Sequence, residues 1–198
     1  MSWSVFNKFP HHTFYWKGID GTSIFSHFPP ADTYVSDGSV ADVLKCIEEN
    51  KDKGRTNSSL LLFGEGDGGG GPHLEHVEHL ARIKDFEGIP KVKFSTCHEF
   101  FEEAKETSTK LMTWEGELYL ELHNGTYTTM SEHKYYNRFM ETLLRDVEIF
   151  HYLNSLTNTE NAAKIHQEIK EMWYVFLIDQ FHDVLPGTCT YLTVNDTR

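Results

Sequence analysis

The chain has 198 residues, of which 39% are hydrophobic and 14% aromatic, and its formal net charge is -12 at pH 7. This aromatic content is typical of a folded chain with a core, and the length suits one ordinary domain or two small ones. The acidic balance argues against a nucleic-acid partner, which needs a basic surface, and no apolar run approaches the roughly 18 residues that would suggest a membrane partner.

The N-terminal half alternates between strand and helix signals. Short aromatic or β-branched runs at 14–16 and 24–28 indicate strands, and a helical pattern over 40–49 follows Ser39, an expected N-cap. The alternation then continues through strands and helices over the segments 60–63, 74–83, 92–94 and 97–105. This order predicts an α/β domain.

The C-terminal part changes character, because strand signals largely stop after Trp114. A long amphipathic helix is predicted to begin near Thr129, where Thr129 and Glu132 have capping-box spacing. A polar turn over 154–161 leads to a second amphipathic helix, which we expect to stop at the Pro-Gly pair 186–187. Two such helices joined by a short turn indicate part of an antiparallel helix bundle, so the expected fold class is α/β followed by all-α.

The three cysteines, Cys46, Cys97 and Cys189, are widely spaced, and no CxxC pair occurs. A scattered odd set is typical of reduced, buried thiols rather than of a disulfide framework. The first residues also lack the basic and apolar regions of a secretory signal. The chain therefore reads as a protein of a reducing compartment.

The most unusual local sequence is the glycine-rich loop over 64–72, which follows a predicted strand and ends in Pro72, an expected first helical residue. Its formal GxGxxG suggests a dinucleotide site, but the next predicted strand lacks the acidic residue that such a site requires. Asp67 lies among glycines at the carboxyl end of a strand, where it can present its carboxyl group to a ligand. A turn-capping aspartate in a flexible loop is the alternative.

Two segments contain histidines of a kind that can ligate a metal. His182 and Asp183 come at the end of the last predicted helix, where the imidazole can ligate a metal and the carboxylate can accept sugar hydroxyls, although a structural histidine is the alternative. His73, His76 and His79 recur three residues apart among glutamates, which fits a solvated helix face better than a metal site.

The turn over 18–21 places Asp20 near Trp16 and other aromatic residues. A carboxylate among aromatic rings is a common composition for sugar-binding clefts, since rings stack on pyranose faces. The same aromatic residues could equally belong to the core.

Taken together, five segments resemble the family 38 α-mannosidases, most nearly the cytosolic type: residues 7–22, 27–34, 63–72, 114–129 and 179–183. They follow the family's order and span nearly the whole chain. The resemblance implies that residues 1–112 are the C-terminal part of a (β/α) barrel-like catalytic domain and residues 113–198 part of a helical middle domain. It also implies a mannose-containing oligosaccharide as substrate, a homo-oligomeric parent protein and a cytoplasmic location, with a vacuole or lysosome as the alternative.

The resemblance further implies a retaining mechanism with an aspartate nucleophile and a second carboxyl group that acts as acid and then base. Asp67 matches the acid/base position, and His182 matches a ligand of the catalytic Zn²⁺. Asp183 matches the neighbouring group that holds mannose hydroxyls. Asp20 and Trp16 match the substrate cleft.

The family's remaining zinc ligands, a His-x-Asp pair and the nucleophilic aspartate, are expected upstream of Met1 and are not in this chain. Catalytic zinc takes about three protein ligands, and divalent cobalt, which the cytosolic type can use, has the same need. We therefore expect the 198 residues alone to be inactive and to retain no metal. The alternative function is a non-catalytic carbohydrate-binding or regulatory derivative of the family.

Overall fold

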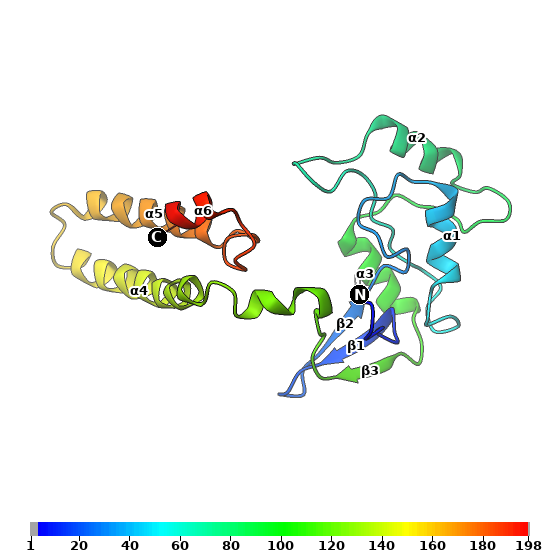
Figure 1. Cartoon of the computed structure of the whole chain (residues 1–198), viewed down its shortest axis with the longest axis horizontal. Coiled ribbons are helices and arrows are strands. Elements are labelled where there is room, and N and C mark those ends of the chain that lie inside the picture. Colours follow the sequence, from blue (N-terminus) through cyan, green and yellow to red (C-terminus); the bar gives the residue numbers. More distant parts are fainter. Residues whose placement is uncertain (1–3, 198) are drawn as a thin grey trace. The chain divides into compact units, whose positions relative to one another are not determined.

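The computed structural model describes residues 4–197. It divides into two compact units, Met1–Glu121 and Leu122–Arg198, which are described separately below. The first unit is a mixed α/β structure and the second is helical (Figure 1). None of the helices in the described range is long and apolar enough to cross a membrane.

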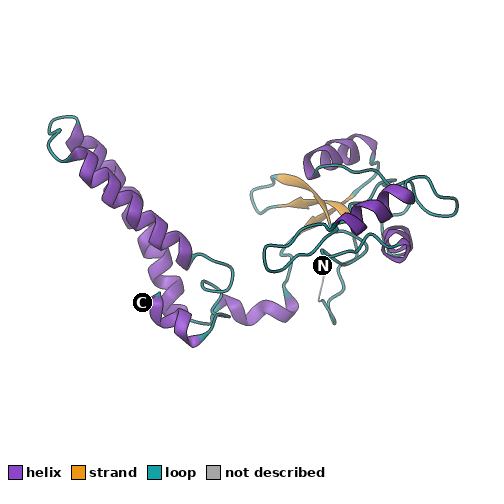
Figure 2. Ribbon diagram, turned by 90° about the horizontal axis from the view of Figure 1, so that it is seen from above, coloured by secondary structure: helices purple, strands orange, loops and turns teal. Residues whose placement is uncertain are grey.

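The first unit contains a three-stranded sheet with the order β2-β1-β3 (Figure 2). Strand β1, Thr13–Lys17, pairs antiparallel with β2, Ser23–His27, and parallel with β3, Met112–Glu115, so that Trp16 lies opposite Trp114. The first two strands confirm the expectations for 14–16 and 24–28. The third was not predicted, because it is four residues long, mostly exposed, and defined only by its pairing with β1.

Among its described residues, the first unit has three α-helices: α1, Val40–Glu48; α2, Leu74–Arg82; and α3, Cys97–Thr107. All three confirm the helical segments expected from the sequence. Ser39 caps α1 as expected, because its side chain accepts a hydrogen bond from the backbone N–H of Asp42. The N-cap of α2 is His73, so the expectation that Pro72 opens that helix was wrong.

The strands expected at 60–63 and 92–94 do not form. Within the described residues the first of these segments makes a single parallel bridge, between Ser36 and Phe63, and the second makes no bridge. A strand needs a partner along its whole edge, and apolar sequence alone does not supply one. The first unit is therefore a mixed sheet with helices beside it. The (β/α) barrel-like domain implied by the resemblance stays a prediction.

The core of the first unit lies on both faces of the sheet. Phe14 is fully buried and its ring centroid lies 4.8 Å from that of Phe9, which in turn lies 4.8 Å from Trp114. On the opposite face, the ring of His27 lies 4.9 Å from Phe100 of α3. Successive residues of a strand point to opposite faces, so β1 and β2 each contribute to both layers.

A fully buried aspartate, Asp52, stabilises the start of β1 through hydrogen bonds. The carboxylate of Asp52 accepts hydrogen bonds from the backbone N–H groups of His12 at 2.7 Å and Thr13 at 3.0 Å. It also lies 3.0 Å from Nδ1 of His11 and 3.2 Å from a guanidinium nitrogen of Arg55. Each carboxylate oxygen therefore has partners, which is the condition for burying a charge.

The second unit is built on a helical hairpin. Helix α4, Ser131–Ser155, and helix α5, Ala162–Asp179, run antiparallel, and a short helix α6, Tyr191–Asp196, follows (Figures 1 and 2). The connecting turn confirms the expected polar turn at 154–161. The side chains buried in this unit include Leu144, Ile169 and Phe176. The hairpin agrees with the sequence, and a larger bundle stays a prediction.

The expected start of α4 near Thr129 is confirmed, but the expected cap at Thr129 and the expected end of α5 were wrong. Helix α4 begins after Met130, which has a left-handed backbone with φ 56°, and the side chain of Thr129 donates to the carbonyl of Gly125 instead of capping the helix. Helix α5 ends at Asp179, well before Pro186, and its last turn leads into a series of turns. Proline and glycine mark where a helix cannot continue, and they do not require it to reach that point.

The three cysteines are all free. Cys46 is buried, and burial raises the pKa of its thiol, as expected for a structural cysteine. Cys97 is exposed at the first position of α3 and Cys189 is half-buried, so the expectation of buried thiols holds for Cys46 and was wrong for Cys97. A helix start that faces solvent leaves its first side chain uncovered.

Candidate functional site

The glycine-rich loop over 64–72 is closed by its own backbone. The N–H of Glu65 donates to the carbonyl of Gly71 at 2.9 Å, and the N–H of Gly70 donates to the carbonyl of Asp67 at 3.3 Å. A Cβ atom at Gly70 would lie 2.5 Å from the Cβ of Glu65, so the two sides of the loop approach too closely for a side chain there. The glycines therefore make a narrow loop with Asp67 at its tip.

Asp67 is exposed at this tip. A Cβ at either of the next two residues, Gly68 and Gly69, would meet no atom within 4 Å. Among the described residues, the carbonyl of Asp67 closes the turn, and no hydrogen bond ties its carboxylate to another group. The carboxyl group is thus open to an incoming molecule.

Trp16 and Asp20 both lie at the β1–β2 hairpin, but their side chains bond to different partners. The indole Nε1 of Trp16 donates to the carbonyl of Gly116 at 2.8 Å, while the residue stays 37% exposed. Asp20 accepts from the backbone N–H of Thr22 at 2.9 Å and from its hydroxyl at 3.0 Å, and these bonds lower the pKa of the carboxyl group. The ring and the carboxylate are both exposed, and Asp20 also stabilises its own turn.

His182 and Asp183 lie in the turns that follow α5, not within that helix as the sequence suggested. Their side chains are 79% and 52% exposed, and Nε2 of His182 lies 3.6 Å from a carboxylate oxygen of Asp183. The carboxylate also accepts from the hydroxyl of Thr188 at 2.9 Å, and the carbonyl of Asp183 accepts from the backbone N–H groups of Thr188 and Cys189. These bonds stabilise the turn at Asp183, and the imidazole of His182 stays exposed to solvent.

The described residues do not make a metal site on their own. No group of three or more histidine, cysteine, aspartate or glutamate side chains in that range could hold an ion. His182 has one carboxylate neighbour, and zinc in proteins takes about three or more protein ligands. The histidines of α2 lie on a mostly exposed face, where the rings of His73 and His76 are 5.2 Å apart.

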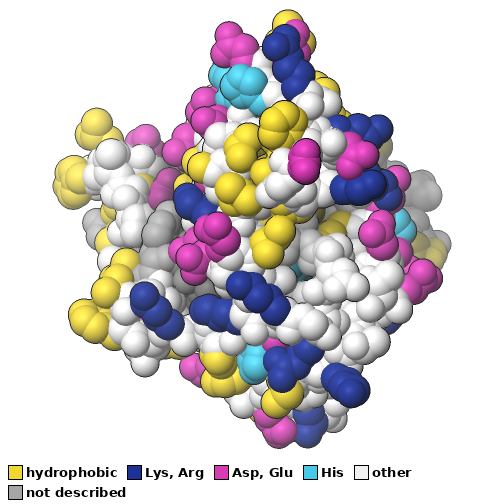
Figure 3. Space-filling view, turned by 90° about the vertical axis from the view of Figure 1, so that its right-hand side faces the viewer, with side chains coloured by type: hydrophobic (Ala, Val, Ile, Leu, Met, Phe, Trp, Pro, Cys, Tyr) yellow, Lys and Arg dark blue, Asp and Glu magenta, His cyan; other side chains and the backbone are white. Residues whose placement is uncertain are grey.

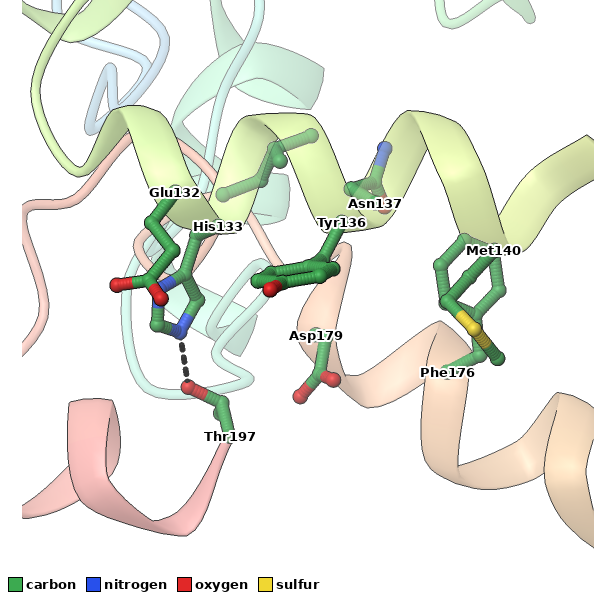
Figure 4. Close-up of a pocket in the computed structure, with 9 residues that line it drawn as sticks. Glu132, His133, Tyr136, Asn137, Met140, Phe176, Asp179 and Thr197 are labelled. Carbon is green, nitrogen blue, oxygen red and sulfur yellow. Dashed lines mark hydrogen bonds between the residues drawn. The ribbon is translucent and has the colours of Figure 1, made fainter.

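A cavity of about 520 Å³ lies between α4, α5 and the C-terminal residues of the second unit (Figure 4). His133 of α4 is hydrogen-bonded across it to Thr197, and Asp179 of α5 faces into it. Burial raises the pKa of Asp179, and the nearby charge of His133 opposes that shift. Neither His182 nor Asp183 lines this cavity.

The sequence did not single out Glu121, the last residue of the first unit. Its carboxylate accepts hydrogen bonds from three successive backbone N–H groups: those of Val5 at 3.1 Å, Phe6 at 2.7 Å and Asn7 at 2.7 Å. These bonds, that of Asn7 first, lower the pKa of Glu121. No local pattern reveals this contact, because it joins opposite ends of the unit.

Charged side chains of both signs lie on the face of the first unit shown in Figure 3. In the lower half of this view Lys and Arg side chains gather, whereas in the upper half charges of both signs and apolar side chains lie together.

Two family models match the chain in succession. Residues 1–117 match the glycosyl hydrolases family 38 N-terminal domain, and residues 121–198 match the alpha mannosidase middle domain. The chain is 46% identical over 198 residues to Alpha-mannosidase 2C1 of Mus musculus, and 44% identical over 196 residues to Alpha-mannosidase G of Dictyostelium discoideum. Each match covers 99% of this chain, but only 19% and 18% of the respective relative. The chain thus spans about a fifth of the length of the curated relatives it matches.

Proposed function

The chain belongs to family 38 of the glycosyl hydrolases, and on that premise we propose that it supplies the acid/base carboxyl group and part of the sugar site of an α-mannosidase. Relatives that are 39% to 46% identical over almost all of the chain carry the name α-mannosidase. The proposed substrate is a terminal α-linked mannose of an oligosaccharide. Because the chain spans about a fifth of these relatives, the activity is assigned to a larger protein in which other segments complete the site.

Asp67 is the proposed acid/base group. In a retaining reaction it protonates the glycosidic oxygen as the bond to mannose breaks, and it then takes a proton from the water that releases the sugar. The observation that supports this role is its place at the tip of a narrow glycine loop, exposed and with its carboxylate unengaged by the described residues. The nucleophilic carboxylate belongs, in this proposal, to a segment outside the 198 residues.

Asp183, Asp20 and Trp16 are the proposed substrate-binding residues. The exposed ring of Trp16 can stack on a pyranose face, and the two carboxylates can accept sugar hydroxyls. Each carboxylate is held by a neighbouring threonine, Thr188 for Asp183 and Thr22 for Asp20, which fixes its orientation and leaves it exposed. These contacts support a preorganised role rather than a flexible one.

His182 is proposed as one of several protein ligands to a zinc or cobalt ion in the larger protein. Its exposed imidazole on a fixed turn supports this assignment. The described residues of this chain alone do not fit such an ion, because no three of their side chains are grouped as ligands. A cytoplasmic location and a homo-oligomeric parent remain predictions from the sequence.

The direct test uses a hybrid enzyme, in which these 198 residues replace the matching 198 residues of the mouse relative. Asp67→Asn should lower kcat/KM for a mannose disaccharide by about 100-fold or more, the range of general acid catalysis. It should change kcat/KM for an activated aryl α-mannoside far less, because that leaving group departs without a proton. Asp85→Asn, at an exposed aspartate paired with Lys91, is the matched control and should change neither value. Equal losses on both substrates would reject Asp67 as the acid.

A non-catalytic carbohydrate-binding protein is the second candidate, and the exposed ring of Trp16 beside the Asp20 turn favours it. The two candidates differ in what the isolated chain does with mannose. Part of an enzyme site should show no saturable change in tryptophan fluorescence as mannose is added, whereas a binding protein should show one that Trp16→Phe removes.

A further inference from the structure

The loop that carries Asp67 rests against a segment that precedes α1. A Cβ atom at Gly66 would lie 2.6 Å from Cγ1 of Val35 and 2.8 Å from two ring carbons of Tyr34. These separations are far shorter than non-bonded contacts of about 3.5 to 4.0 Å, so only glycine lets the loop backbone sit there. Gly66 is not among the described residues with a positive φ, and its role is therefore close approach rather than backbone freedom.

The segment that supports Gly66 is itself fixed in place. Ser36, next to Val35, is 1% exposed, and its backbone N–H donates to the carbonyl of Leu62 at 3.3 Å. Its carbonyl accepts from the N–H of Gly64 at 2.8 Å. These two bonds join Ser36 to both neighbours of Phe63, so the backbone next to Tyr34 and Val35 is held beside the start of the loop.

The other side of the loop is open. A Cβ at Gly68 or Gly69 would meet nothing within 4 Å, while Glu65 is held through its bond to Gly71. Asp67 is restrained within the loop by the bond from the Gly70 N–H to its carbonyl, and its neighbour Gly66 lies against Tyr34 and Val35 of another segment. The contact at Gly66 therefore joins the residue next to Asp67 to side chains outside the loop.

We propose that Tyr34 and Val35 are positioning residues for Asp67, acting through Gly66. The inference rests on the proposed function, in which Asp67 is the acid/base group. A general acid must come within about 2.6 to 3.2 Å of the oxygen that it protonates, and a misplacement of about 1 Å can cost roughly 100-fold in rate. Both side chains are 45% exposed, so replacing them removes the contact with Gly66 without removing a buried core residue.

Hydrogen exchange in the 198-residue chain tests whether these side chains hold the loop. The Tyr34→Ala/Val35→Ala double variant should raise the exchange rate of the Glu65 amide, whose bond to Gly71 closes the loop, by about tenfold or more. Gly66→Ala should do the same while leaving both supporting side chains intact. Val40→Ala is the matched control, because that valine is similarly exposed, at 41%, and lies on α1.

Unchanged Glu65 exchange in both loop variants would overturn the proposal. Amides of α3, which lies in the same unit but outside the loop, report whether a variant has unfolded that unit as a whole. If the double variant unfolds, Gly66→Ala decides the question by itself.

Kinetics in the hybrid enzyme test whether the contact acts through the acid. Tyr34→Ala and Val35→Ala should each lower kcat/KM for a mannose disaccharide by about tenfold or more, but by less than about twofold for an activated aryl α-mannoside. Tyr34→Phe keeps the ring and should retain activity on both. Equal losses on the two substrates, or none, would overturn the proposal.

The Asp67→Asn variant separates this proposal from the proposed function. If Asp67→Asn itself fails to discriminate between the two substrates, the acid/base assignment is wrong, and the exchange rates still decide whether Tyr34 and Val35 hold the loop. If Asp67→Asn discriminates and the Tyr34 and Val35 variants do not, the positioning role alone is rejected. An inactive hybrid leaves the exchange experiment to decide.

Discussion

Two buried histidines lie beside the start of β1 and are held neutral. Burial, and next the charge of Lys51, lowers the pKa of His12 to about 4, and its Nδ1 accepts the backbone N–H of Lys51 at 3.0 Å. Burial, and next the charge of His12, lowers the pKa of His27 to about 4, and its ring bonds to Thr13 and to the N–H of Leu60. Both rings act as hydrogen-bonding groups of the core, which no sequence pattern separates from metal-binding histidines.

The first prediction concerns acid stability. Between pH 6.5, the ordinary value, and about pH 4, the unfolded chain binds protons at His12 and His27 that the folded chain does not. Stability is therefore full above this window and falls as the pH decreases, by about 1.4 kcal/mol per pH unit for each histidine. Urea unfolding at pH 7, 6 and 5 measures this slope. His27→Gln should flatten it, His98→Gln at an exposed position should not, and a free energy of unfolding that is constant over this range would contradict the account.

The second prediction concerns Asp52. Burial by itself raises the pKa of this carboxyl group, but the bonds from Thr13, His12 and His11 outweigh burial and lower it. Asp52→Ala should lower the free energy of unfolding by about 3 kcal/mol, because it leaves buried N–H groups unpaired. Asp85→Ala, on an exposed side chain, should change it by less than about 0.5 kcal/mol. Similar losses of unfolding free energy for the two variants in urea would show that the buried carboxylate does not stabilise the fold.

Helices were easier to locate from the sequence than strands, for a physical reason. The start of a helix depends on residues that are adjacent in the chain, such as Ser39 before α1 and Thr96 with Glu99 before α3. Strands depend on partners far along the chain, so β3 was missed and the apolar segment 60–63 was predicted as a strand that it does not form. The capping spacing at Thr129 matched a pattern, but the preceding turn used that hydroxyl.

The same difference applies to the candidate site. Asp67 could be proposed from the sequence, because a carboxylate among glycines after an apolar segment is a local pattern. Tyr34 and Val35 could not, since their contact with Gly66 depends on how two distant segments lie together. His182 was expected to close the last helix, but it lies in the turns after α5, because that helix ends earlier than the sequence suggested.

The third prediction concerns the cap of α3. The hydroxyl of Thr96 accepts the N–H of Glu99 at 3.2 Å, and the Glu99 carboxylate accepts the N–H of Thr96 at 2.8 Å. Thr96→Ala should therefore cost about 1 kcal/mol in the free energy of unfolding. Thr109→Ala, at an exposed threonine outside the helix, is the control and should cost much less. A cap that contributes nothing would give the same value for both variants.

At the scale of the whole molecule, the residues with proposed roles are distributed over both units. The first holds Asp67, Asp20 and Trp16, and the second holds His182 and Asp183. Neither unit contains, among its described residues, a set of side chains that could bind a metal alone. A chain that spans about a fifth of its relatives is therefore proposed to contribute residues to a site rather than to form one.

The fourth prediction concerns metal content. The isolated 198-residue chain should retain less than about 0.1 zinc per molecule after dialysis, since one exposed imidazole supplies too few ligands. The hybrid enzyme should retain about one zinc per catalytic site, and His182→Gln should reduce that content, whereas His98→Gln should not. Elemental analysis by mass spectrometry measures all four proteins. Stoichiometric zinc in the isolated chain would mean that the chain has a complete site.

The most direct measurement of the central claim is turnover of an activated aryl α-mannoside by the isolated chain and by the hybrid enzyme, side by side. The account predicts turnover by the hybrid and none by the 198 residues alone. Activity that copurifies with the isolated chain, or a correctly folded, zinc-loaded hybrid without activity, would contradict it.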